Sequence, residues 1–149
     1  MAAEEVFDQL LEVSLLLEAD MSRSMAELGL TVTRTHLLWE VQQNGPCTQQ
    51  RLAQAIRVSP RHVTGLVDAL ESDGFARRLP HPADRRAVLV ALTDKGTATM
   101  TEMQEQRRRA AGELVSDLDD RSVEQLQRSL GTVLTRLRRL VADASGSAG

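Results

Sequence analysis

The chain contains few cysteine and aromatic residues. It has one cysteine, Cys47, no tyrosine, one tryptophan and two phenylalanines. A single cysteine cannot form an internal disulfide, which is typical of proteins from a reducing compartment. Because aromatic side chains are so few, the core has to be built from Leu, Val, Ala and Met, a composition that suits helices.

Long hydrophobic runs are also missing. No stretch approaches the roughly 20 apolar residues that a membrane-spanning helix needs. The first five residues, Met1 to Glu5, are acidic where a secretion signal would be basic. We therefore expect a cytoplasmic protein with no membrane partner.

The sequence carries no signature of catalysis. Its three histidines, His36, His62 and His81, belong to no triad motif, and there is neither a phosphate-binding glycine loop nor a CxxC pair. His36 and Glu40 stand one helical turn apart and could ligate a metal, but such a pair is more often an exposed helix face. We expect no enzyme activity, no cofactor and no metal.

Charge is unevenly distributed along the 149 residues, a length that suits one compact domain with long helices packed against it. The formal net charge of −3 does not by itself suggest nucleic acid. Residues 1–56 carry a net charge of −5, residues 57–95 carry +2, and residues 96–149 are neutral. The middle of the chain is therefore its only positive segment.

This positive segment has the pattern of a helix-turn-helix. Thr48 and Ser59 are good N-caps for two helices, and Pro60 fits the first helical position because its missing N–H would be unpaired there. Gly74 is placed to end the second helix. The apolar residues at helical spacing are Leu52, Ala53 and Ile56, then Val63, Leu66, Val67 and Leu70.

A hairpin pattern follows the second helix. Two short alternating runs, Phe75 to Leu79 and Ala87 to Leu92, are separated by a rigid, basic loop at residues 80–86. This pattern predicts a β-hairpin wing. A helix that can enter a groove and a basic loop beside it form a DNA-reading arrangement.

Five segments together resemble the MarR family of bacterial transcription regulators. They are Leu52-Ala53, Ser59 to Thr64, Leu70 to Phe75, Asp84-Arg85-Arg86, and Leu92-Thr93-Asp94-Lys95-Gly96. A helix-turn-helix alone occurs in many folds. Its combination with the Asp-Arg-Arg wing and the Leu-Thr-Asp-Lys-Gly segment that follows the wing is specific. The resemblance implies a mainly α fold with a small β-hairpin wing, and a homodimeric regulator that binds double-stranded DNA, more often as a repressor.

Further helices are predicted around the winged helix-turn-helix. Residues 4–28 form one, an N-cap at Thr33 starts a short one to Gln43, and Thr93 caps a long one to about Asp117. The last helix begins within residues 119–122. There Ser122 and Gln125 match a capping box, while Asp119 or Asp120 are alternative caps.

The terminal helices carry more apolar surface than one subunit can cover, so we expect a homodimer. The seam of the last helix consists of Leu126, Leu130, Val133, Leu137 and Leu140 or Val141. We predict a single MarR-type chain over residues 1–149, with a DNA-binding region at 33–95. Residues 1–30 and 96–144 are the predicted dimerisation helices, and residues 145–149 are a predicted flexible tail.

The candidate DNA contacts follow from side-chain chemistry and from the resemblance. Arg61 and His62 are suited to base edges, because arginine pairs bidentately with guanine, and Thr64 can reach bases or phosphates. The family's wing motif implies that Arg86 and Arg85 enter the minor groove. The full candidate set is Thr48, Gln49, Ser59, Arg61, His62, Thr64, Arg77, Asp84, Arg85 and Arg86, with Asp84 holding the arginine in place.

The sequence departs from the family in three places. Gly65 stands where a longer polar side chain is frequent, which permits a closer approach of the helix. Asp68 and Glu71 would repel phosphate if they lay near it. Arg57 occupies the inter-helix turn where glycine is frequent, at a cost of roughly 1 kcal/mol if its φ is positive.

His36 and Trp39 are the candidate ligand-binding residues. They lie on the helix face opposite the apolar stripe of Leu37, Leu38 and Val41. One interpretation is that Trp39 packs against the long terminal helices. The other, implied by the resemblance, is that both side chains line a cavity for a small aromatic or phenolic ligand.

Two alternatives to a ligand-responsive DNA-binding regulator remain open. Cys47 near a helix N-terminus could be the input of a redox-sensing regulator. The winged helix could also serve protein contacts without any DNA site, although the arginines at positions 77, 78, 85 and 86 argue against this.

Overall fold

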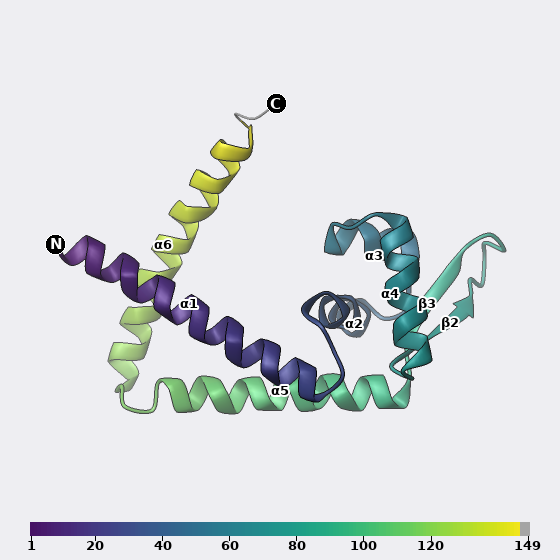
Figure 1. Cartoon of the computed structure of the whole chain (residues 1–149), viewed down its shortest axis with the longest axis horizontal. Helices are drawn as coiled ribbons and strands as arrows, with labels where there is room; N and C mark the ends of the chain where they lie inside the picture. Colours follow the sequence, from purple (N-terminus) through teal and green to yellow (C-terminus); the bar gives the residue numbers. More distant parts are fainter. Residues whose placement is uncertain (147–149) are drawn as a thin grey trace. The chain divides into compact units, whose positions relative to one another are not determined.

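The computed structural model describes residues 1–146 and consists mainly of helices with a small antiparallel sheet, as the sequence predicts (Figure 1). The elements are, in chain order, α1 (Ala2–Glu27), α2 (Val32–Asn44), β1 (Cys47–Thr48), α3 (Gln49–Ile56), α4 (Pro60–Ser72), β2 (Ala76–Pro80), β3 (Val88–Leu92), α5 (Asp94–Leu114) and α6 (Asp120–Gly146). The chain divides into two compact units, Met1–Met103 and the part that starts at Gln104.

The helix-turn-helix begins where its caps predict. The hydroxyl oxygen of Thr48 accepts the N–H of Arg51 at 3.2 Å, and that of Ser59 accepts the N–H of His62 at 3.1 Å. Each bond satisfies one backbone donor that has no partner inside its helix. Pro60 is the first residue of α4, as expected.

Arg57 lies in the turn between α3 and α4 and adopts a left-handed conformation, with φ 55° and ψ 49°. In residues 1–146 it is the one non-glycine residue with positive φ. The expected cost of roughly 1 kcal/mol for a side chain in this conformation therefore applies.

The start of α2 differs from the expectation. Thr31, and not Thr33, is its N-cap, because Thr31 has extended backbone angles and its hydroxyl oxygen accepts the N–H of Arg34 at 3.3 Å. Gly29, at φ 75°, ends α1, and the buried Leu30 follows it directly. The chain has therefore completed its turn by residue 31, and Thr33 lies inside the helix.

The boundaries of the last two helices also differ in detail. Thr93 caps α5 as predicted, but α5 ends at Leu114. Asp119 is the cap of α6, because its Oδ1 accepts the N–H of Ser122 at 2.8 Å. Hydrogen bonds from the side chain and backbone of Ser122 lower the pKa of Asp119.

In the predicted flexible tail, residues 145 and 146 belong to α6, and residues 147–149 lie outside the described residues.

The sheet has the strand order β1-β3-β2 over the described residues, and all its pairs are antiparallel. The hairpin of β2 and β3 confirms the predicted wing. Strand β1 was not predicted: Cys47 pairs with Val90 and Thr48 with Leu89. Two residues are too few to show the alternation that marks a strand, so the sequence around Cys47 gave no sign of β1.

The core of the unit Met1–Met103 gathers the predicted inward faces of α2 and α4. It contains Leu37, Leu38, Val41, Leu52, Val63, Val67, Leu70, Phe75, Val90 and Met100, all at most 3% exposed. Burial of these side chains fixes which face of α4 is turned outward. That outward face carries the candidate site.

Candidate nucleic-acid interface

Helix α4 packs against both helix α3 and strand β2, with the β2–β3 hairpin beside it (Figure 1). Because Val63, Val67 and Leu70 are fully buried, the opposite side of α4 faces solvent. This side carries Arg61, His62, Thr64, Gly65 and Asp68, all of them exposed. The structure therefore brings most of the candidate helix residues onto one surface next to the wing.

Four of the candidate arginines are exposed and carry uncompensated charge. Within residues 1–146, none of them forms an ion pair; they are Arg61, Arg77, Arg85 and Arg86. A cationic side chain without a protein partner remains available for phosphate oxygens and base edges. The arrangement is a basic surface on α4 and the wing.

The wing loop is held by side chains that bond its own backbone. Oδ1 of Asp84 accepts the N–H of Arg86 at 2.9 Å. Nδ1 of His81 accepts the N–H groups of Ala83 at 3.1 Å and of Asp84 at 3.0 Å. Asp84 thus orders the main chain of Arg86 and leaves the guanidinium free. No sequence pattern indicated this role of His81, because the role depends on the path of the loop.

Arg78 differs from the other wing arginines. Its side chain is 24% exposed and forms ion pairs with Asp68 at 2.7 Å and Glu71 at 3.1 Å. The two acids that were expected to repel phosphate are therefore paired with an arginine. Arg78 therefore adds no free charge to the wing, unlike Arg77, because the packing of β2 on α4 places only Arg78 beside Asp68 and Glu71.

The pair Gln49 and Thr64 is also engaged within the protein. Nε2 of Gln49 donates to the Thr64 hydroxyl oxygen at 3.1 Å, and Arg78 Nε donates to Gln49 Oε1 at 3.0 Å. We define Arg78, Gln49, Thr64, Asp68 and Glu71 as the Arg78 cluster. It joins the first residue of α3, the middle of α4 and strand β2.

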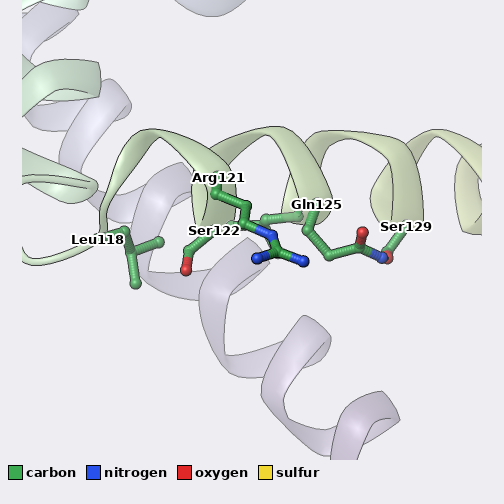
Figure 2. Close-up of a pocket in the computed structure, with 6 residues that line it drawn as sticks. Leu118, Arg121, Ser122, Gln125 and Ser129 are labelled. Atoms are coloured by element: carbon green, nitrogen blue, oxygen red, sulfur yellow. The ribbon is translucent and has the colours of Figure 1, made fainter.

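The candidate ligand residues His36 and Trp39 have different surroundings. His36 is exposed, while Trp39 is half-buried and packs against the core of the unit Met1–Met103. Figure 2 shows a groove along one side of α6, with Leu118, Arg121 and Gln125 among its lining residues. Neither this groove nor the next one along α6 includes His36 or Trp39.

Cys47 is only 3% exposed, and its thiol lies 3.0 Å from the carbonyl oxygen of Gly45, to which it donates. Burial raises the pKa of the Cys47 thiol above its ordinary value, and Glu40 raises it further, while Arg51 acts in the opposite direction. A buried thiol with a raised pKa holds little reactive thiolate.

Metal-ligating side chains are scattered over the described chain. No group of three or more of them comes together in residues 1–146. In the same part of the chain, no helix is both long and apolar enough to cross a membrane.

The fold and this surface define a winged helix-turn-helix of the kind found in DNA-binding transcription regulators. A family model described as MarR family matches residues 30–88, so the winged helix-turn-helix region of the chain is a MarR-type domain. The match covers α2, the helix-turn-helix and the wing up to the start of β3.

Individual relatives agree with this assignment. The transcriptional activatory protein BadR of Rhodopseudomonas palustris is 28% identical over 149 residues, covering 97% of this chain and 85% of BadR. The HTH-type transcriptional repressor IacR of Pseudomonas putida is 26% identical over 121 residues, or 81% and 72% of the two chains. The crystal structure of RV1404 from Mycobacterium tuberculosis matches with a TM-score of 0.74 and 28% identity. The match covers 91% of this chain and 94% of RV1404.

Proposed function

We propose that this chain is a homodimeric repressor of the MarR family that binds a pseudo-palindromic operator and responds to a small aromatic or phenolic ligand. The observation that carries the DNA-binding part is the set of exposed arginines without acidic partners on α4 and the wing. We further propose that the chain acts in the cytoplasm and catalyses no reaction.

Helix α4 is proposed to enter the major groove. Arg61 and His62 lie in its first turn, where the recognition helix of a helix-turn-helix contacts base edges. Thr48 and Gln49, at the start of α3, and Ser59 are proposed to bind phosphates through side-chain and backbone donors. Arg85 and Arg86 enter the minor groove, and Arg77 binds the adjacent phosphates.

Dimerisation is supported by apolar surface that the chain leaves uncovered. In the described residues of α6 no side chain is buried, and its seam residues Leu126, Val133 and Leu137 are 41–52% exposed. Helix α1 buries only Met25. Amphipathic helices of this length are stable when their apolar faces are covered. We propose that residues 1–30 and 96–144 of two copies cover each other.

A two-fold dimer sets the form of the operator. Two recognition helices related by a two-fold axis meet successive major grooves about 34 Å apart, so half-sites lie roughly 10 base pairs apart. A footprint that protects two such half-sites supports the dimer. Protection of one half-site alone contradicts it.

The direction of regulation differs between the relatives of this chain. IacR is named a repressor, whereas BadR, with slightly higher identity, is named an activatory protein. A reporter gene behind the chain's own upstream DNA decides between them. Expression that falls when the chain is present supports repression, and expression that rises contradicts it.

The ligand response is proposed for a site at His36 and Trp39. These residues are one helical turn apart on α2, one exposed and the other half-buried, so an aromatic anion can pair with the first and stack on the second. Coupling between ligand and DNA binding is typically about 1–3 kcal/mol. Because Trp39 is the chain's only tryptophan, titration with salicylate-like compounds should quench its fluorescence. A panel that produces no quenching contradicts the site.

The central experiment is a gel shift of the full chain with its own upstream DNA. A specific, salt-sensitive shift that competitor DNA of unrelated sequence does not remove supports the proposed function. If no DNA is bound at low salt, the winged helix is instead a protein-interaction module.

A further inference from the structure

We propose that Arg78 is a positioning residue of the DNA-reading surface. It holds the side chain of Gln49 and, through Gln49, the hydroxyl of Thr64, and it does not contact DNA itself. This inference rests on the proposed function, because it concerns how the same surface is ordered.

The Arg78 guanidinium donates three hydrogen bonds to partners inside the protein and forms a further ion-pair contact with Asp68. Nε donates to Gln49 Oε1 at 3.0 Å, and Nη1 donates to Glu71 Oε1 at 3.1 Å. Nη2 lies 2.7 Å from Asp68 Oδ1 and 3.3 Å from the carbonyl oxygen of Thr64. The two-pronged donor face that an arginine offers to a phosphate or a guanine is therefore already occupied.

The charges around Arg78 exclude a direct electrostatic role. One guanidinium faces two carboxylates, those of Asp68 and Glu71. The cluster has a net charge of −1 and adds nothing to the attraction of phosphate. Arg77, its neighbour in β2, is exposed and has no acidic partner in the described chain. Adjacent residues of one strand thus have different tasks.

The link from Arg78 to Gln49 determines which end of the amide faces Thr64. Because Gln49 Oε1 accepts from Arg78, Nε2 is turned to the Thr64 hydroxyl oxygen, 3.1 Å away. The Thr64 hydroxyl in turn donates its only proton to the carbonyl oxygen of Pro60 at 3.1 Å. Thr64 is left with a free lone pair and no free proton.

This arrangement of donors and acceptors limits which groups of the DNA the Thr64 hydroxyl can bind. Thr64 can accept a hydrogen bond from adenine N6 or cytosine N4 in the major groove, but it cannot donate to a phosphate oxygen. Gln49 keeps one N–H, which can donate to a phosphate. The sequence alone allowed Thr64 either role, and the Arg78 cluster selects the acceptor role.

The backbone of Arg78 strengthens the same arrangement. Its N–H donates to Glu71 Oε2 at 2.9 Å. Since β2 lies at the edge of the sheet, this N–H would otherwise have no partner in the sheet. Glu71 therefore binds both the main chain and the side chain of Arg78, which ties the wing strand to α4.

The test uses Arg78→Lys in the full chain. Lysine keeps the positive charge between the two acids, but a single ammonium group cannot reproduce the fork that also reaches Gln49. We expect a folded protein by circular dichroism, with DNA affinity about tenfold lower, the equivalent of one hydrogen bond. The slope of log affinity against log salt should not change. Arg108→Lys, at an exposed position of α5 outside the proposed DNA-binding surface, is the control and should stay within about threefold of wild type.

A double-mutant cycle with Gln49→Ala separates positioning from direct contact. If Arg78 acts through Gln49, the double variant binds no worse than the weaker single variant. If Arg78 contacts DNA itself, the two effects multiply. Multiplying effects, or wild-type affinity of Arg78→Lys, overturns the inference.

A second measurement does not depend on the stability of Arg78 variants. In Gln49→Ala, the Thr64 hydroxyl is no longer held by the amide, so discrimination at one base pair of the operator should relax when single base substitutions are scanned. A decrease in affinity that is uniform across all base pairs overturns the inference. If wild-type protein itself binds no upstream DNA, the proposed function fails instead, and the two failures are therefore distinguishable.

Discussion

Gly96 lies so close to Phe75 that a Cβ atom built on the glycine would be 2.0 Å from the Phe75 carbonyl oxygen. The same carbonyl accepts the N–H of Thr93 at 3.1 Å, and the Thr93 hydroxyl oxygen accepts the N–H of Gly96 at 3.0 Å. Thr93 also donates to the carbonyl oxygen of Gly74. The Leu-Thr-Asp-Lys-Gly segment therefore fixes the start of α5 against the chain that leaves α4.

Gly96→Ala should destabilise the protein strongly. A methyl group cannot be accommodated against a backbone oxygen without moving an element, and overpacking of this kind costs about 1–3 kcal/mol or more. Urea unfolding measures the decrease in stability. Gly65→Ala is the control, because a Cβ at Gly65 meets nothing within 4 Å, and it should stabilise the helix by about 0.5–1 kcal/mol. Equal effects of the two substitutions would contradict the close approach of Gly96 to Phe75.

Arg86→Ala should weaken DNA binding without weakening the fold. Substitution of an exposed loop residue usually shifts stability by within about 0.5 kcal/mol. The salt slope of binding should fall by roughly 0.9 for each phosphate that a subunit no longer binds. Arg108→Ala in α5 removes the same charge from another exposed position and should leave affinity and slope unchanged. Wild-type binding by Arg86→Ala would exclude the wing as a DNA element.

Arg61→Ala should alter the base preference of the protein more than its overall affinity for DNA. If Arg61 pairs with a guanine, its removal costs about 1–3 kcal/mol at that base pair alone. Binding to a set of operators with single base substitutions measures this. A decrease in affinity by the same factor for every operator would show that Arg61 binds only the backbone.

Leu137→Glu should disrupt the dimer. Leu137 is 52% exposed in the seam of α6, and a carboxylate buried there without a partner would raise the dissociation constant of the dimer at least about tenfold. Sedimentation velocity at several concentrations gives the result. Thr135→Glu, which by helical periodicity lies on the opposite face of α6, should leave the dimer intact. If both variants behave like wild type, the seam is not the interface.

Cys47 should react slowly in the native protein. Because burial raises the pKa of its thiol, alkylation by iodoacetamide at about pH 8 should be much slower in native than in urea-unfolded protein. The folded state keeps the proton longer than the unfolded state, so stability should fall as the pH rises past the ordinary pKa of cysteine. Peroxide should leave DNA binding unchanged. Fast native alkylation together with peroxide-sensitive DNA binding would favour the redox-sensing alternative.

Local chemistry explains why much of the fold was predictable. The caps at Thr48, Ser59 and Thr93 satisfy backbone donors a few residues away, and each cap formed as expected. The apolar faces of α2 and α4 follow from helical periodicity, and both are buried. The wing strands are five residues long each and overlap the two runs from which the hairpin was predicted.

The sequence alone determined the helix starts that depend on such short-range bonds, the inward faces, and the resemblance to the family. Tertiary packing decided the rest. Strand β1 exists only because β3 lies beside it, and Arg78 differs from Arg77 only because Asp68, Glu71 and Gln49 surround it in space. These partners are 7 to 43 residues apart in sequence, and pairing over such distances leaves no periodic pattern from which it could be predicted.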